Sequence, residues 1–373
     1  MTKSPYTGLD GVIAGTTAIS TLDGGLHYRG YAIEELARDA TFSEVAYLLL
    51  HGELPSQEHL ADFRAILAEA VEVPEPVIEL LHELPLHVAP IDALRTAVSA
   101  LAHFDPQESE VTETANLGKA IRLLGQIPVL IAARHRLTRG LELVASDPEL
   151  SFAGNLLALL HGQVPSGAHE RALETSLICY ADHDFNASTF TARVVASTGS
   201  DLHSAVAAAI GALKGPLHGG ANEQVWEVLQ EVGSPAHAEK FVRDAIAMKR
   251  RIAGFGHRVY RERPDPREIL LADMCRELAV TAEQHRLEDL AASVARAMWR
   301  QRQLRPNVDW PTARLYHGLG LESELFTPLF VAARVVGWAA HVIEQQQENR
   351  LIQPRSRYVG HPPRKFEPLQ DRA

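Results

Sequence analysis

The sequence predicts an all-α protein, and three observations predict it. Several apolar-rich segments of helical length stop at glycine or proline, alternating strand patterns are scarce, and no repeat of fixed period indicates a solenoid. The 373 residues, of which 46% are hydrophobic and 22% charged, fit a folded globular chain. Because this length exceeds one ordinary core, we expect a large helical domain and a smaller helical lobe.

The early elements follow from local pattern. Residues 12–19 are the only reasonable strand candidate, since apolar and polar side chains alternate there. Residues 42–51 are apolar-rich and stop at Gly52, a pattern typical of a helix. Further helices are predicted over residues 91–103, 117–134 and 203–214, the last halted by Gly215-Pro216.

Two later helices begin at proline. Asp265-Pro266 is a good N-cap and first-turn pair, and Thr327-Pro328 starts a helix that runs toward Gln347. Turn-forming clusters at residues 215–220 and 305–311 bracket about a hundred residues between them. A lobe hinged at these clusters would place functional groups at the seam between lobes, where clefts usually lie.

Composition excludes some partners. The net charge of −11 gives no reason to expect nucleic-acid binding, although residues 243–267 carry eight basic side chains against three acidic ones. The two cysteines, Cys179 and Cys275, cannot form a disulfide framework and suit a reducing compartment. With no leader-like pattern at the start and no apolar run of membrane-spanning length, we expect a cytoplasmic protein without a membrane partner.

Four separated motifs carry most of the chemistry. They read Asp-His-Asp-Phe-Asn-Ala-Ser-Thr from residue 182, Gly-Pro-Leu-His-Gly-Gly-Ala-Asn from 215, Gly-Phe-Gly-His-Arg-Val-Tyr from 254, and Pro-Asn-Val-Asp from 306. Glycines beside His218 and His257 let the backbone turn tightly and approach a ligand. Two imidazoles and one carboxylate are sufficient acid/base groups to make and trap an enolate.

Each of these groups also has a plainer interpretation. His218 lies between two predicted helices, with Asn222 as a candidate N-cap, and it could simply cap that loop. Nearby helix N-termini would keep its imidazole neutral and able to donate a hydrogen bond. His257 could belong to a solvated basic loop, and Asp309 could be an N-cap. Against a cleft wall beside Trp310, however, partial desolvation would make Asp309 a stronger base.

Arg334 and His183 complete the candidates that the residues themselves indicate. Arg334 interrupts an apolar helix, so its buried guanidinium needs an anionic partner, either an internal carboxylate or a ligand. His183 has acidic neighbours, but adjacent residues on a helix do not readily converge on one ion, and neither HExxH nor paired Cys-x-x-Cys occurs. We therefore predict no metal site.

Taken together, the motifs resemble the active site of citrate synthase. The likeness extends to Leu26–Leu36 near the start, to Phe104-Asp105-Pro106, and to residues 349–360 near the end, all in the family's order. The resemblance implies an all-α dimer with active sites shared between its subunits. It also implies a small domain over residues 222–316, a large domain over residues 1–221 and 317–373, and an active site in the cleft between them.

The resemblance also implies roles for single residues. Asp309 would remove the methyl proton of acetyl-CoA, His218 would stabilise the enolate, and His257 would protonate the carbonyl oxygen of oxaloacetate. Oxaloacetate would be held by His183, Arg267, Arg334 and Arg355. The coenzyme A thioester would be a co-substrate, with no permanently bound cofactor, and would lie against Arg251, Ile252, Ala253, Gly254 and Phe255.

One departure from the family pattern concerns the C-terminal signature. Where the family has an arginine that reaches a substrate carboxylate across the dimer interface, this chain has Gln353, with Arg355 two residues further on. The resemblance implies a citrate synthase that condenses acetyl-CoA with oxaloacetate and hydrolyses citryl-CoA to citrate and coenzyme A, but this departure leaves the exact substrate open. A 2-methylcitrate synthase that uses propionyl-CoA, a citryl-CoA lyase and a non-catalytic helical dimer are the alternatives.

Overall fold

The computed structural model describes residue 9 and residues 11–257, 259–261 and 263–372, and this part of the chain is mostly helical. The predicted all-α class is confirmed. The first ten helices are α1 (Ile33–Asp39), α2 (Phe42–His51), α3 (Gln57–Glu69), α4 (Glu75–Glu83), α5 (Pro90–Leu101), α6 (Glu113–Leu137), α7 (Phe152–His161), α8 (Gly167–Tyr180), α9 (Ala187–Ser197) and α10 (Leu202–Leu213). The later ones are α11 (Ala221–Val232), α12 (Ala238–Ala247), α13 (Pro266–Leu278), α14 (Ala282–Arg302), α15 (Asp309–Gly318) and α16 (Phe326–Gln347).

The strand prediction over residues 12–19 is wrong. The only strands in the described residues are β1 (Ser20–Thr21), β2 (His27–Tyr28) and β3 (Tyr31–Ala32), which form a small antiparallel sheet. Residues 12–17 are irregular because neighbouring helices take up their backbone groups. Arg193 of α9 donates to the carbonyl of Thr16 at 3.4 Å, and the amide of Ala18 donates to Glu344 of α16 at 2.7 Å.

The predicted helix boundaries are largely confirmed. Helix α2 begins after Thr41, whose hydroxyl accepts from the amide of Glu44, and ends at Gly52 in the left-handed conformation. Asp265 is the N-cap of α13, since its side chain accepts from the amide of Arg267 at 3.1 Å. Asn222 is not an N-cap, however: α11 starts after Gly220, and Asn222 is buried inside its first turn.

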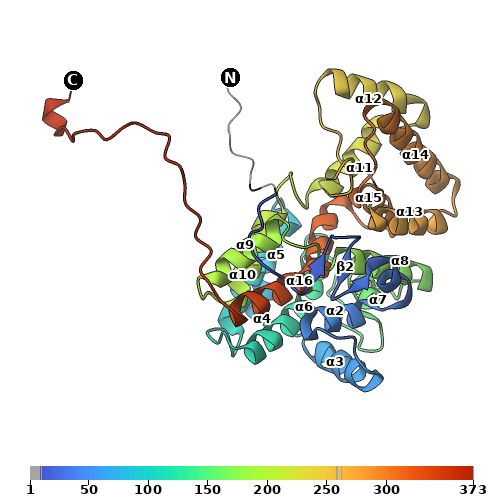
Figure 1. The fold of residues 1–373 in the computed structure, drawn as a ribbon. Coiled ribbons are helices and arrows are strands. Elements are labelled where there is room, and N and C mark those ends of the chain that lie inside the picture. Colours follow the sequence, from blue (N-terminus) through green and yellow to red (C-terminus); the bar gives the residue numbers. More distant parts are fainter. Residues whose placement is uncertain (1–8, 10, 258, 262, 373) are drawn as a thin grey trace.

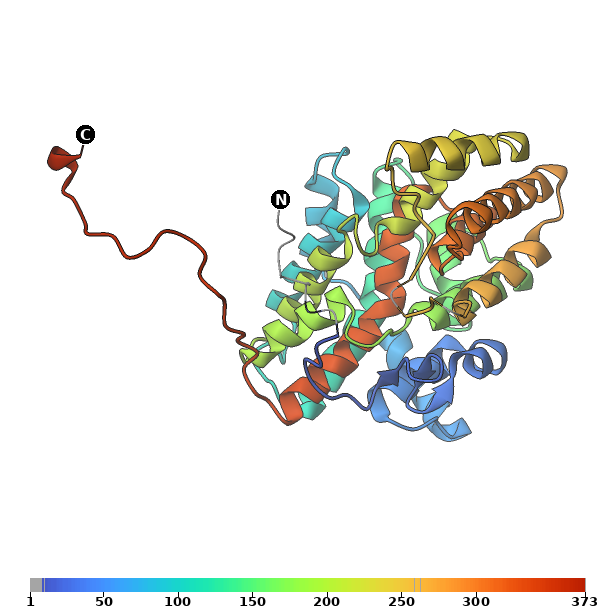
Figure 2. The same cartoon turned by 45° about the horizontal axis from the view of Figure 1, so that its top comes forward.

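Helix α16 is the core of the molecule (Figure 2). It packs against α2, α6, α8, α9 and α10, and its residues from Phe326 to Ile343 are buried. By length and composition the segment Ser323–Gln347 could cross a membrane, but its most apolar stretch lies entirely inside the protein. Such burial is typical of a core helix that is hydrophobic on all sides.

Helices α11 to α15 gather on one side of the molecule in Figure 1. There α12 packs against α14, and α15 packs against α11 and α13. This group meets the remaining helices where α13 contacts α1 and α8. Arg263 adds a link, because its guanidinium donates at 2.7 Å to the carbonyl of Gly24 in the turn before β2. The division into domains at residues 222 and 316 stays a prediction.

The chain leaves this body after α16 as an extended tail (Figures 1 and 2). Ile352 still donates to Ser197 at 3.1 Å. Beyond it, the described residues of the tail hydrogen-bond only among themselves, and nearly all of them are exposed. The tail therefore gains no stability from packing on its own chain.

Candidate active site

Asp309 lies at the first position of α15, where solvent still reaches part of its side chain. It is not a helix cap, because the N-cap position is Val308 and makes no side-chain cap bond. Its carboxylate accepts a hydrogen bond from the Tyr180 hydroxyl at 3.0 Å. Surrounding protein raises the pKa of Asp309 to about 6, while that hydrogen bond and the charge of Arg267 oppose the increase. Asp309 can therefore act as a base near neutral pH.

His218 lies in the turn between α10 and α11 and meets the start of α9. Its Nε2 accepts from the amide of Ser188 at 3.3 Å and lies 2.8 Å from the Ser188 hydroxyl. Burial, and then the charge of Arg334, lowers the pKa of His218 to about 4. A neutral ring whose Nε2 accepts carries its proton on Nδ1. His218 can thus donate a hydrogen bond without being charged, but burial and Arg334 keep it neutral rather than the helix N-termini that the sequence suggested.

His257 lies in the loop between α12 and α13. Its Nδ1 accepts hydrogen bonds from the amides of Val259 at 3.1 Å and Tyr260 at 3.4 Å, so in the neutral ring the proton is on Nε2. The His257 ring lies 5.3 Å from the ring of His183 and 4.7 Å from that of Tyr260. The loop between α12 and α13 therefore brings a proton donor, the Nε2 of His257, close to His183, which follows α8.

Three further predicted residues, His183, Arg267 and Arg334, lie together near His257. Burial, together with the positive charges of Arg267 and Arg334 and the neighbouring His257, holds the pKa of His183 well below its usual range. The buried Nε2 of His183 has no hydrogen-bond partner among the described residues. A neutral imidazole facing two guanidiniums fits an anionic, carbonyl-containing ligand that accepts hydrogen bonds.

The two arginines differ in how they are held. Arg267 makes a two-pronged contact with Asp265, at 3.0 and 2.8 Å. Arg334 donates from Nε to the carbonyl of Tyr180 at 2.6 Å, and it forms no ion pair with the described residues. The charge of Asp182 acts on Arg334 and opposes the burial that lowers its pKa. A buried guanidinium without a carboxylate in contact is suited to hold an anionic ligand.

The predicted coenzyme A loop runs beside Asp309. Arg251 is exposed, whereas residues 252–255 are buried. Gly254 has φ +83°, and a side chain there would meet Trp310 at 2.7 Å, so this position requires glycine. Asn307 ties the two segments together, because its amide donates to Gly254 at 2.9 Å and its side chain to Gly256 at 3.1 Å. His257 and Asp309 are therefore fixed relative to each other.

Arg355 is not brought to this place by its own chain. It is exposed on the extended tail, as is Gln353. The predicted contact of Arg355 with substrate therefore depends on a second subunit.

Two residues of this site were missed by sequence reasoning. Tyr180, the last residue of α8, joins Asp309 through its hydroxyl and Arg334 through its carbonyl. Ser188 orients His218. Ser188 belonged to a motif already noted, so its place beside a helix start was a usable signal. Tyr180 carried none, because it looks like any aromatic residue of a buried helix.

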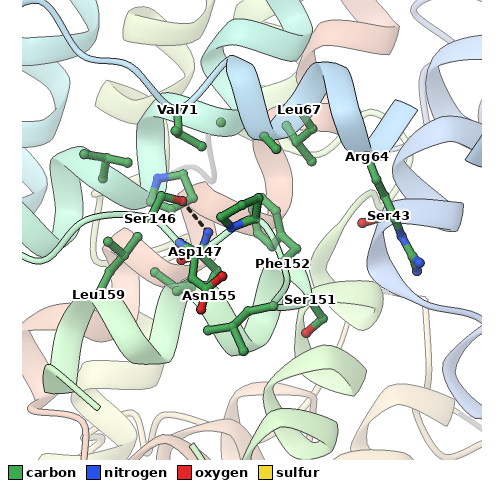
Figure 3. A pocket seen from close by; sticks show the side chains of 17 residues that line it. Ser43, Arg64, Leu67, Val71, Ser146, Asp147, Ser151, Phe152, Asn155 and Leu159 are labelled. Carbon is green, nitrogen blue, oxygen red and sulfur yellow. Dashed lines mark hydrogen bonds between the residues drawn. The ribbon is translucent and has the colours of Figure 1, made fainter. Parts of the chain in front are cut away.

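A separate hollow of about 80 Å³ lies between α3, α6, α7 and the loop before α7 (Figure 3). Its wall includes Arg64 and Asp147 but none of the predicted site residues. Asn155 reaches across to Ser146 there. Since this hollow gathers no acid/base pair, it is not our candidate. In the described part of the chain no cluster of metal-ligating side chains occurs either.

Comparison with known proteins agrees with this geometry. The family model described as "Citrate synthase, C-terminal domain" matches residues 8–355. This chain belongs to the citrate synthase family. It is 42% identical to citrate synthase 2 of Bacillus subtilis, over 98% of this chain and 99% of the relative. It is also 42% identical to a 2-methylcitrate synthase of Shewanella oneidensis, over 98% of this chain and 97% of the relative.

Solved structures give the same result. Citrate synthase from Thermotoga maritima superposes with a TM-score of 0.89 at 37% identity, covering 98% of this chain and 99% of that one. The enzyme from Thermoplasma acidophilum, in ternary complex with carboxymethyl coenzyme A and oxaloacetate, has a TM-score of 0.93 at 31% identity, covering 98% of both chains. The chain is therefore an enzyme of the acyl-CoA condensing type, and the alternative of a non-catalytic dimer is set aside.

Proposed function

We propose that this enzyme condenses acetyl-CoA with oxaloacetate and hydrolyses the resulting citryl-CoA to citrate and coenzyme A. The observation that carries the proposal is the pairing of a base and a neutral donor within one site. Asp309 has a pKa of about 6, and His218 is held neutral with its proton on Nδ1. Removal of a proton next to a thioester requires both groups, because the developing oxyanion must be stabilised as the base takes the proton.

Oxaloacetate binds first in this proposal. Arg334 and Arg267 hold its carboxylates, and the unpartnered Nε2 of His183 hydrogen-bonds to it. His257 directs its Nε2 proton at the ketone oxygen, since its Nδ1 already accepts from the backbone. The ketone carbon is then ready for attack.

The condensation follows at the acyl carbon next to the thioester. Asp309 takes its proton, and the electron pair forms an enolate whose oxygen accepts from His218. The enolate carbon attacks the ketone carbon, and the ketone oxygen receives the proton from His257. Water then cleaves the thioester bond, which gives the carboxylic acid and the thiol. The loop of residues 251–255 is our proposed contact for coenzyme A, with Arg251 available to a phosphate.

A thiol-release assay tests this proposal. Purified enzyme with oxaloacetate and acetyl-CoA should release free coenzyme A, and mass spectrometry should identify citrate. Release that needs no oxaloacetate would instead indicate a plain thioesterase. Activity only in the direction of citryl-CoA cleavage would favour the lyase.

A second candidate, 2-methylcitrate synthesis from propionyl-CoA, is favoured by the relatives. The chain is 43% identical to a 2-methylcitrate synthase of Mycobacterium tuberculosis and 39% identical to a citrate/2-methylcitrate synthase of Bacillus subtilis. The same base and donor would serve either acyl chain. The ratio of kcat/KM for acetyl-CoA and propionyl-CoA decides between the two.

We further propose a homodimer with shared active sites and a hinged small domain of residues 222–316. The unpacked tail beyond Ile352 supports the dimer, since a second copy would give it a surface to cover. Sedimentation should show two chains, and X-ray scattering should show compaction on addition of oxaloacetate.

We also propose a cytoplasmic location. The two free, buried cysteines support this location, and cell fractionation tests it.

A further inference from the structure

The hydroxyl of Tyr180 lies between two acceptors. It is 3.0 Å from Oδ1 of Asp309 and 3.0 Å from Oγ1 of Thr312, one turn further along α15. Thr312 donates its own hydrogen to the carbonyl of Val308 at 2.7 Å, so toward Tyr180 it can only accept. A tyrosine hydroxyl has one hydrogen to give. Asp309 and Thr312 therefore compete for it.

The charge of Asp309 decides this competition. A hydrogen bond to an ionised carboxylate is roughly twice as strong as one between neutral groups. While Asp309 is ionised, it attracts the hydrogen of Tyr180. Once Asp309 is protonated, it has no such advantage over the Thr312 oxygen. Tyr180 and Thr312 are both buried, so the hydroxyl cannot turn to solvent instead.

We propose that Tyr180 and Thr312 form a two-position hydrogen-bond switch, which holds Asp309 both before and after it takes the substrate proton. The inference rests on the proposed function, in which Asp309 is the base. The acyl C–H bond breaks, its proton goes to the carboxylate, and its electron pair stays in the enolate. The hydrogen of Tyr180 then turns from Asp309 to Thr312, and no proton leaves these three side chains. Tyr180 is a positioning residue, since it acts through Asp309.

Other charged groups also face Asp309 from the start of α13 and the loop after α12, and one further titratable group lies on α15. Arg267 lowers and Asp265 raises its pKa from the start of α13, while Arg251 lowers it from the loop after α12. On α15 itself, the Tyr316 hydroxyl lies two turns away and pairs with Ser176 of α8 at 2.9 Å. None of these groups contacts the hydroxyl of Tyr180. A change confined to the switch therefore leaves them in place.

Two substitutions should move the pKa of Asp309 in opposite directions. Tyr180→Phe removes the donor that favours the ionised form, so the acid limb of kcat/KM should move to higher pH by about one unit. Thr312→Val removes the competing acceptor, which leaves the hydrogen to Asp309 and should move the limb to lower pH by roughly half a unit. Both variants keep the Tyr180 carbonyl that accepts from Arg334.

Tyr316→Phe is the matched control. It removes a buried tyrosine hydroxyl that likewise joins α8 to α15, but one bonded to Ser176 and not to Asp309. Its acid limb should coincide with that of the wild-type enzyme. Tyr180→Phe also preserves the edge-on packing of this ring on Phe330, with centroids 4.4 Å apart.

An infrared titration of the carboxyl stretch gives a readout that does not need turnover. The band that Asp309→Asn abolishes should titrate higher in Tyr180→Phe and lower in Thr312→Val than in the wild type. Shifts in the same direction, or shifts equal to those of Tyr316→Phe, overturn the switch. If the wild-type enzyme condenses no acyl-CoA with oxaloacetate, the proposed function fails instead, and the band positions still report on the hydrogen bonds.

Discussion

Asp182 and Asp309 lie on neighbouring segments of the same site, one fully and the other largely shielded from solvent, but their pKa values move in opposite directions. Burial raises the pKa of each. At Asp182 the effect is outweighed by His341, by Arg334 and by the Ser20 hydroxyl, so its pKa is lowered. At Asp309 the Tyr180 hydroxyl and more distant arginines do not outweigh it, so its pKa rises to about 6.

The number of hydrogen-bond donors therefore distinguishes Asp182, whose pKa is lowered, from Asp309, whose raised pKa lets it act as a base. Asp182 accepts from Ser20, from the amide of Asp184 at 3.2 Å and from His341 at 3.3 Å. It joins the N-terminal sheet to α16 through these bonds. From the residues that the structure describes, Asp309 accepts a single side-chain hydrogen bond, which leaves its remaining lone pairs for a proton. A carboxylate with few donors binds a proton more tightly.

The largest expected effect concerns Asp309, the proposed base. Asp309→Asn is nearly isosteric but cannot accept the substrate proton, so turnover should fall by about 10²–10⁴. Oxaloacetate binding, measured by calorimetry, should be nearly unchanged, because His183 and the arginines remain. If the variant keeps more than about a tenth of wild-type turnover, Asp309 is not the base.

The next largest effect concerns Asp182 and the stability of the fold. Asp182→Asn removes the charge opposite His341 and Arg334, and breaking a buried pair costs about 3–5 kcal/mol. The free energy of unfolding in urea should fall by that order. Asp184→Asn is the control, since it removes the same charge two residues away from a less buried side chain, and it should change the free energy by less than about 0.5 kcal/mol. Equal losses in the two variants would refute the contrast.

The free energy of unfolding should change in opposite directions in Asp309→Asn and in Asp182→Asn. The folded pKa of Asp309, about 6, lies above its usual value of 3.8, so its ionisation disfavours folding increasingly as pH rises through this window. Asp309→Asn should therefore stabilise the fold, by at most about 3 kcal/mol and by less where solvent reaches the side chain. The gain should be larger at about pH 8 than at about pH 5. Asp182→Asn should lose stability at both.

The sequence allowed the histidines and Asp309 to be chosen as candidates because glycines and proline mark their turns. It predicted the helices around them from start and stop residues such as Gly52 and Asp265. It did not identify Tyr180 or the partners of Asp182, because these contacts join segments more than a hundred residues apart. The strand prediction over residues 12–19 failed for the same reason, since side chains of α9 and α16 take up that backbone.

A further prediction extends the comparison to histidine. Burial, and then the charge of Arg334, keeps His218 neutral, and the Ser188 amide donates to its Nε2, so its Nδ1 proton is available to the enolate oxygen. Removing one such donor costs roughly 2.7–4 kcal/mol in barrier height. His218→Gly should therefore lower kcat far more than it raises KM. Ser188→Ala, which keeps the backbone amide, should lower kcat less. An effect on KM alone would make His218 a binding residue.

The smallest effect concerns a contrast between two arginines. Arg334 is buried within its own chain's site, whereas Arg355 is exposed on the tail. If the tail of a partner subunit completes the site, one of residues 353 and 355 should face a substrate carboxylate. A hydrogen bond to a charged group contributes ~1.5–3 kcal/mol and a neutral one ~0.5–1.5 kcal/mol, a difference that corresponds to roughly tenfold in affinity.

We expect Arg355 to make this contact, because a dicarboxylate left one cation short would bind poorly. Arg355→Gln should then raise the KM for oxaloacetate about tenfold or more, while Gln353→Arg should be nearly silent. If Gln353 faces the site instead, Gln353→Arg should lower KM by a similar factor and Arg355→Gln should have no effect. Arg364→Gln, further along the same tail, controls for the loss of charge alone. Two silent substitutions would show that neither residue reaches the substrate, and that the tail serves association of the subunits rather than the site.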